Sequence, residues 1–176
     1  ADEIDRVLPT IRSRCRLIRA GAPTREQALE WLKSQGVQDA ERKLTEAGGM
    51  PLAVFDEDAR FRLADETRER FLAYLRLGHA APPAQALSVA DKDVTLSAAA
   101  LFLSRWGWDL ASAKVGCEPQ YFPEFAEEIK TIAQAANPTG LYTWINSVRD
   151  IRRVSEHPLN AKTMIEALLI SYARNI

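Results

Sequence analysis

Histidine and cysteine, the side chains that most often build zinc centres and disulfide frameworks, are scarce in this sequence. The 176 residues contain two histidines and two cysteines, Cys15 and Cys117, which lie far apart in the chain. This spacing gives no disulfide framework and no ligand pattern for structural zinc, so we expect no metal site and a reducing, cytoplasmic compartment. A hydrolase built on either thiol is also disfavoured, because neither has a candidate base at a suggestive spacing.

An excess of charge of one sign and a long hydrophobic run are also missing. Lysine and arginine together number 23 against 24 aspartates and glutamates, for a net charge of −1. Near neutrality argues against broad electrostatic capture of nucleic acid, although it leaves room for local basic patches. Because no run reaches about 18 apolar residues, we expect no membrane span, and the acidic first residues are unlike a secretory signal. The chain starts without Met and close to a turn motif, so we interpret it as a C-terminal fragment.

Alternating β-branched segments are absent too, and helical spacing of apolar residues predicts an all-α fold. Three short helices are expected first: one opened by a capping box at Thr24–Gln27, one capped by Asp39 and ended by Gly48-Gly49, and one begun by Pro51. Further helices are expected at 61–77, at 83–89, after a cap at Asp91 or Asp93, around 125–133, at 139–155, and after a cap at Asn160.

The segment Leu8-Pro9-Thr10-Ile11-Arg12-Ser13-Arg14-Cys15 gives the strongest functional signal. Pro9 lacks an N–H group and fixes φ, so we expect no helix to run through it, and Thr10 or Ser13 could cap the next element. A guanidinium beside a turn can hold a phosphate through two parallel hydrogen bonds. The arginines available for this are Arg12, Arg14, Arg16 and Arg19. A solvated basic loop is the alternative interpretation.

This octapeptide resembles the Ser-Arg-Cys motif of AAA+ clamp-loader subunits of bacterial DNA polymerase III. Ala47-Gly48-Gly49-Met50-Pro51-Leu52-Ala53 is similar to the Gly-x-Pro segment of that family's small helical lid. His157-Pro158-Leu159-Asn160 and the helix through Tyr172 are similar to its last collar helix. The resemblance implies the end of an ATPase-like domain at 1–20, a three-helix lid at 21–56 and a helical-bundle collar at 57–176. Between about 57 and 155 the likeness is confined to helical character and length.

The resemblance also implies roles for the residues of the motif. Arg14 would be an arginine finger that acts in trans on the ATP site of a neighbouring subunit, which binds the ATP and Mg²⁺. Ser13 would orient the turn, and Cys15 is expected to pack as a small buried side chain. Leu52 follows Pro51 where active members of the family place a nucleotide-sensing arginine, so this chain would bind no nucleotide and hydrolyse no ATP.

The partners implied are the motor and delta subunits in a hetero-pentamer, with the sliding clamp and primed DNA reached through the complex. An ATP-hydrolysing motor subunit of the same loader is a second interpretation, which Leu52 disfavours. A third is an independent nucleic-acid-binding module that uses Arg12–Arg19 together with Arg149, Arg152 and Arg153. Trp106 and Trp108 would stack bases in that case, although Trp106 continues an apolar helix face typical of a core.

Overall fold

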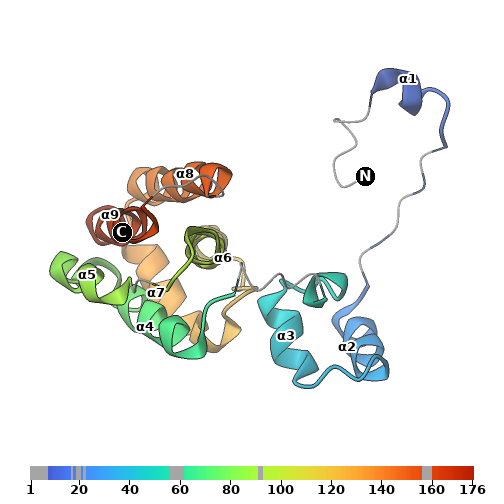
Figure 1. Ribbon diagram of the computed structural model, residues 1–176, viewed down its shortest axis with the longest axis horizontal. Helices are drawn as coiled ribbons and strands as arrows, with labels where there is room; N and C mark the ends of the chain where they lie inside the picture. The colour runs from blue at the N-terminus through green and yellow to red at the C-terminus, as the bar shows by residue number, and fades with distance from the viewer. Residues whose placement is uncertain are drawn as a thin grey trace.

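The computed structural model describes residues 8–16, 18, 21, 23–55, 62–90, 93–155 and 160–176. Every regular element within these ranges is helical, which confirms the predicted all-α class. Figure 1 shows two groups of helices, and each has its own hydrophobic core. We call residues 23–55 the small unit and the described residues from 62 to 176 the large bundle. The division into lid and collar domains stays a prediction.

The small unit is built from α2 (Arg25–Ser34), α3 (Ala40–Glu46) and the 3-10 helix η2 (Leu52–Val54). The predicted capping box is confirmed: Gln27 N–H donates to the Thr24 hydroxyl at 3.3 Å, and Thr24 N–H donates to the Gln27 side chain at 3.0 Å. Gly48 and Gly49 both have positive φ and end α3 as expected. Six buried apolar residues form the core: Ala28, Leu32, Ala40, Leu44, Ala47 and Val54.

Two predicted helix caps are wrong. Asp39 does precede α3, but it lies in the left-handed region at φ 52°, so its carboxylate caps no N–H group and instead pairs with Arg42 at 3.7 Å. An aspartate tolerates this conformation better than most residues. Asp93 does not cap α6, because the helix begins later and the Thr95 hydroxyl accepts the Ala98 N–H at 3.2 Å. Asp91 lies outside the described residues.

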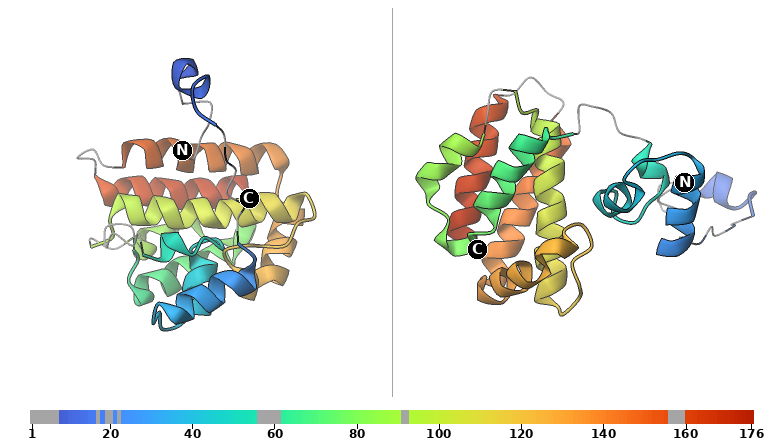
Figure 2. Two further views of the ribbon diagram at one scale, coloured as in Figure 1. Left: turned by 90° about the vertical axis from the view of Figure 1, so that its right-hand side faces the viewer. Right: turned by 90° about the horizontal axis from the view of Figure 1, so that it is seen from below.

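The large bundle contains the longer helices and is arranged around α6. Its α-helices are α4 (Asp65–Leu75), α5 (Ala86–Val89), α6 (Leu96–Lys114), α7 (Ala126–Ala135), α8 (Pro138–Val154) and α9 (Ala161–Asn175). The 3-10 helices are η4 (Gly78–Ala80), η5 (Pro83–Gln85) and η6 (Pro123–Phe125). α6 packs against α7, α8 and α9, and the left view of Figure 2 shows α8 and α9 running alongside it. The expected cap of α9 is confirmed, because the Asn160 side chain accepts the Thr163 N–H.

Buried aromatic side chains tie the helices of the large bundle together through hydrogen bonds to backbone carbonyls. Tyr74 on α4 donates to the Leu169 carbonyl of α9, and Tyr172 on α9 donates back to the Leu75 carbonyl of α4. The Tyr172 oxygen also accepts the Trp106 indole N–H from α6 at 3.2 Å. Trp106 is therefore a core residue, as its position on an apolar face predicted.

Segment 8–16 lies apart from both hydrophobic cores. It contains one helical turn, α1 (Pro9–Arg12), with Pro9 at the first helical position, where its missing N–H costs nothing. Among the described helices, none combines the length and the apolar run needed to cross a membrane.

Candidate functional site

The Ser-Arg-Cys motif forms the turn directly after α1. The N–H groups of Arg14 and Cys15 both donate to the Ile11 carbonyl at 3.1 Å, and the Ser13 hydroxyl donates to the Thr10 carbonyl at 3.1 Å. Neither Thr10 nor Ser13 caps the start of the helix, which begins after Leu8 without a side-chain cap. The expectation that one of them would is therefore wrong: Ser13 closes the turn instead.

Arg14 is exposed, and its guanidinium makes no hydrogen bond or ion pair with any described residue. Its five N–H donors are thus available to a group outside this part of the chain. Its chain neighbours are Ser13, whose hydroxyl is bound within the turn, and the exposed Cys15. The arrangement suits one task, the donation of charge-assisted hydrogen bonds to an anion supplied from elsewhere.

Cys15 is exposed, so the prediction that it packs as a buried side chain is wrong. The physical reason is that no residue of segment 8–16 belongs to either hydrophobic cluster, which leaves the thiol without apolar neighbours in the described structure. Arg12 and Arg16 are exposed as well, and Arg19 lies outside the described residues.

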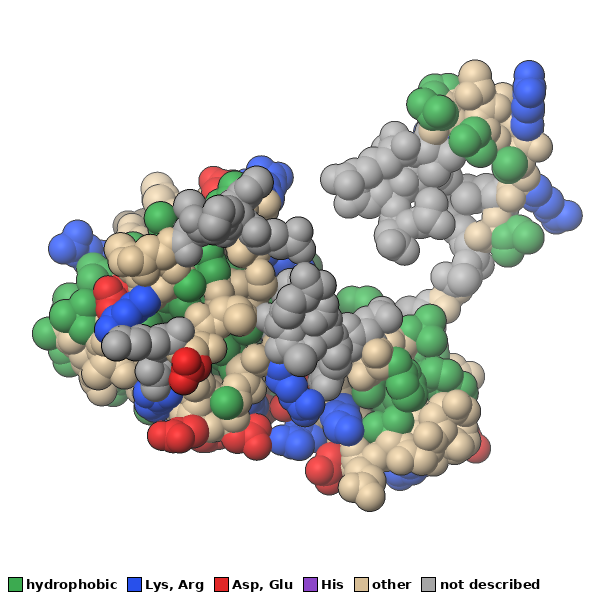
Figure 3. Space-filling view, in the orientation of Figure 1, with side chains coloured by type: hydrophobic (Ala, Val, Ile, Leu, Met, Phe, Trp, Pro, Cys, Tyr) green, Lys and Arg blue, Asp and Glu red, His purple; other side chains and the backbone are tan. Residues whose placement is uncertain are grey.

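Leu52 lies at the start of η2, 69% exposed, and cannot donate a hydrogen bond to a phosphate. Met50 and Phe55 nearby are also more than half exposed, and the Phe55 ring meets Trp31 edge to face at 5.6 Å. The upper face of the small unit in Figure 3 is accordingly apolar. The sequence did not predict this exposed apolar face. Helical spacing puts Trp31 on the apolar side of α2, which indicates a buried position, whereas the structure leaves the ring partly exposed.

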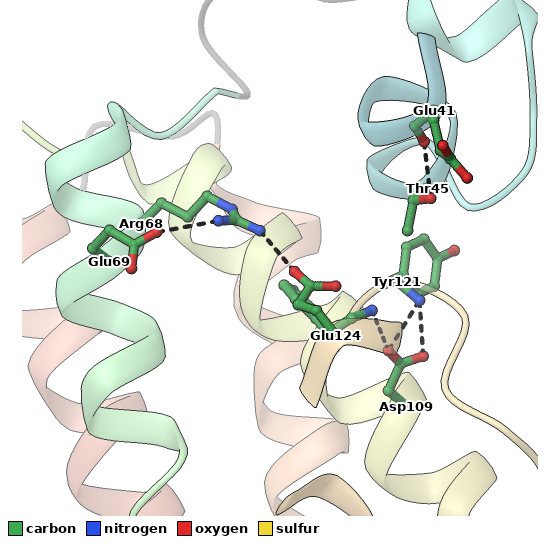
Figure 4. A network of polar contacts seen from close by, with 8 residues as sticks. Glu41, Thr45, Arg68, Glu69, Asp109, Tyr121 and Glu124 are labelled. Atoms are coloured by element: carbon green, nitrogen blue, oxygen red, sulfur yellow. Dashed lines mark hydrogen bonds and ion pairs between the residues drawn. The ribbon is translucent and has the colours of Figure 1, made fainter. Parts of the chain in front are cut away.

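The two units meet where the loop after α6 reaches the end of α3. The Gln120 side chain donates to the Gly48 carbonyl, and the Tyr121 ring lies directly against Gly48. Asp109 on α6 holds this loop in place: its fully buried carboxylate accepts the backbone N–H groups of Gln120, Tyr121 and Phe122 at 2.8–3.2 Å. Figure 4 shows the two bonds from Tyr121. Burial raises the pKa of the Asp109 carboxyl above its ordinary value, and these three donors act in the opposite direction.

A groove of about 600 Å³ lies between the small unit and the large bundle. It brings together two residues singled out in the sequence, Trp108 and Arg152, which come from α6 and α8. Arg149 and Arg153 are also exposed on α8, and Arg153 pairs with Asp150 at 3.5 Å. Arg149, Arg152 and Arg153 are three or four residues apart or adjacent on α8, so they share one exposed side of the helix, and Arg152 also lines the groove.

The acidic residues that come after the loop form ion pairs and no metal centre. Glu124 binds Arg68 at 3.3 Å, as Figure 4 shows, and Glu128 binds Arg76 at 2.7 Å. Within the described ranges, no group of three or more His, Cys, Asp or Glu residues is arranged to hold a metal ion.

Comparison with known proteins gives no relative: no protein-family model, curated protein or solved structure matches the chain.

Proposed function

We propose that this chain is the lid and collar part of a delta prime-type subunit of a bacterial clamp loader. In this proposal it supplies an arginine finger to an ATP site on a neighbouring subunit. The observation that carries the proposal is Arg14, which stands in a Ser-Arg-Cys motif at an exposed turn with its guanidinium unbound by the described residues.

Three sequence likenesses, in the order in which the family has them, support the proposal. They fall at 8–15, at 47–53 and from 157 to 172, although 157–159 lie outside the described residues. An all-helical chain with a small and a large hydrophobic core is compatible with a lid at 21–56 and a collar at 57–176. Residues 1–20 are then the end of an ATPase-like domain.

An arginine finger works by placing positive charge where the γ-phosphate gains negative charge during transfer. Such groups raise the rate of hydrolysis by about 10³–10⁵ in well-characterised nucleotide hydrolases. The finger needs no phosphate-binding loop in its own chain, and this sequence has no Gly-x-x-x-x-Gly-Lys-Ser/Thr segment. Leu52 in place of a sensing arginine fits a subunit that completes its neighbour's site and hydrolyses no ATP itself.

The remaining partners belong to the same proposal. The collar would assemble with the motor and delta subunits into a ring of five, and the complex would place the sliding clamp on primed DNA. Arg14 would then couple the ATP state of the neighbouring motor subunit, which holds the nucleotide and Mg²⁺, to this subunit.

The experiment compares ATP hydrolysis by the reconstituted loader before and after Arg14→Ala in the full-length protein that contains this chain. Hydrolysis at the one ATP site that faces Arg14 should fall by about 10³-fold or more, as loss of a finger does elsewhere. Size-exclusion chromatography should show the five-subunit complex intact, because Arg14 packs against no described core.

Two further variants separate the finger from a general charge effect. Arg16→Ala removes an exposed arginine two residues away and should leave turnover unchanged. Arg14→Lys keeps the charge but loses the planar fork, so it should restore only part of the rate. Unchanged hydrolysis by an assembled Arg14→Ala complex would refute the assignment.

A further inference from the structure

The loop of residues 120–122 is fastened to the large bundle through its main chain. The N–H groups of Gln120, Tyr121 and Phe122 all donate to the carboxylate of Asp109, which is fully buried on α6. Hydrogen bonds to a carboxylate are stronger than those between neutral groups, and the exclusion of water strengthens them further. The backbone of this loop therefore keeps one conformation relative to α6.

Two aromatic side chains of the loop are held by the same bundle. The buried Phe122 ring meets Phe102 and Trp106 edge to face, each at 5.3 Å between ring centroids. Arg105 on α6 places its guanidinium 5.7 Å from the centroid of the Tyr121 ring, within the range of a cation–π attraction. The main chain and the rings of the loop are thus both fixed to the large bundle.

The opposite side of the loop touches the small unit at Gly48. The Gln120 side-chain amide donates to the Gly48 carbonyl, and a Cβ at this glycine would stand 2.6 Å from the Tyr121 ring, so the ring lies directly on the backbone. Gly48 is itself held at the end of α3, because its N–H donates to the Thr45 carbonyl at 2.9 Å. The contact therefore joins a fixed point of the small unit to a fixed loop of the large bundle.

Next to this contact, the facing surfaces of the two units are separated by the groove. Met50 and Ala53 of the small unit line one wall, and Leu101 and Trp108 of α6 line the other. Met50 and Trp108 each keep 58% of their surface exposed, so these described side chains do not pack closely across the groove. Packing at the groove therefore restrains the small unit little, and the loop contact beside it has to supply the restraint.

We propose that the loop 120–122 is a latch that sets the orientation of the small unit on the large bundle, with Asp109 as the residue that positions the latch. When Asp109 loses its acceptor oxygens, the loop is released and the small unit turns against the bundle. Both units stay folded, because the two hydrophobic cores share no residue. This inference does not depend on Arg14 or on the proposed finger.

The test measures the distance between the two units by double electron–electron resonance of spin labels on the 176-residue chain. Labels are attached at Glu30→Cys on α2 and Thr163→Cys on α9, both exposed positions, after the exposed Cys15 and Cys117 have been replaced by serine. The latch predicts one narrow distance distribution. A broad distribution or several distances in this parent chain would overturn the proposal.

The first variant releases the latch at the buried carboxylate. Asp109→Asn replaces one acceptor oxygen by an amide nitrogen, so it should widen the distance distribution by about twofold or more and speed hydrogen exchange of the 120–122 amides. The matched control Asp150→Asn removes one charge from the exposed surface of α8 and should change neither measurement. Unchanged exchange would show that Asp109 does not fasten the loop. Faster exchange with an unchanged distance distribution would show that other contacts hold the small unit, and either result overturns the proposal.

The double variant Gln120→Ala/Tyr121→Ala releases the other side of the latch and leaves the buried carboxylate in place. It removes both contacts with Gly48, so the distance distribution should widen by about twofold or more while circular dichroism keeps its helical signal. Gln134→Ala/Tyr142→Ala removes the same two kinds of side chain from exposed positions on α7 and α8 and should leave the distribution unchanged. Should the first variant fail to fold, this pair decides alone, and equal distributions in the two double variants would refute the latch.

Discussion

The substitution Tyr172→Phe tests whether hydrogen bonds between buried aromatic side chains and backbone hold the large bundle together. The Tyr172 hydroxyl donates to the Leu75 carbonyl at 2.6 Å and accepts the Trp106 indole N–H at 3.2 Å. Leu75 is the last residue of α4, so its carbonyl has no partner within the helix. Removal of one oxygen atom therefore leaves two buried polar groups without a partner.

The expected loss of stability comes from these two groups. Each buried donor or acceptor left unsatisfied costs about 1–3 kcal/mol, and some relaxation is expected, so Tyr172→Phe should lower the free energy of unfolding by about 2–4 kcal/mol. Tyr74→Phe should cost only about 1 kcal/mol, because the Leu169 carbonyl that it serves lies inside α9 and keeps its helical partner.

Urea unfolding followed by circular dichroism measures both values at neutral pH. The exposed Tyr142 provides the matched control, and Tyr142→Phe should change the free energy by less than about 0.5 kcal/mol. Hydrogen exchange should locate the loss at the contact of α4 with α9. If Tyr172→Phe costs no more than Tyr74→Phe, the unpaired groups find other partners and the reasoning is wrong.

Two further predictions concern the junction and the response to acid. Gly48→Ala should destabilise the chain more than Gly36→Ala. Both glycines have positive φ, but an added Cβ at Gly48 would stand 2.6 Å from Tyr121, whereas one at Gly36 meets nothing within 4 Å. Urea unfolding measures the difference between the two variants. The pKa of Glu128 is lowered, first by a hydrogen bond from its own backbone N–H and second by the hydrogen bond from Arg76. The ionised carboxylate therefore stabilises the fold at pH values above its unfolded pKa of about 4.5, and this stabilisation is lost as pH falls below that value. Glu128→Gln should therefore make the decline in urea midpoint between about pH 6 and about pH 3 shallower, and an unchanged slope would contradict this.

Local signals in the sequence predicted much of the helical structure. The capping box at Thr24 and the cap at Asn160 were predictable because each depends on a side chain and an N–H group three residues apart. The cap at Asp39 failed because its left-handed conformation is not encoded by the cap pattern. Burial of Trp106 was predictable from helical spacing, whereas exposure of Cys15 depends on which parts of the fold surround segment 8–16.

Features that depend on distant contacts were not predictable. The carboxylate of Asp109 binds amides more than ten residues later in the chain, and the only local signal was an acidic residue between Trp106 and Leu110 on an apolar face. The groove joins arginines from five separate segments, none of which is unusual by itself. The turn at Arg14 is local, because its hydrogen bonds join residues three or four positions apart.

The buried carboxylate on α6 has a mechanical consequence. Because the loop from Gln120 to Phe122 is fastened to Asp109, it moves with α6 and transmits force between the two units. One end of the loop holds the Gly48 carbonyl, and the Phe122 ring at the other end meets Trp106 at 5.3 Å. A rotation of the small unit that keeps these contacts must therefore pull on the interior of the large bundle, through a route separate from the covalent connection.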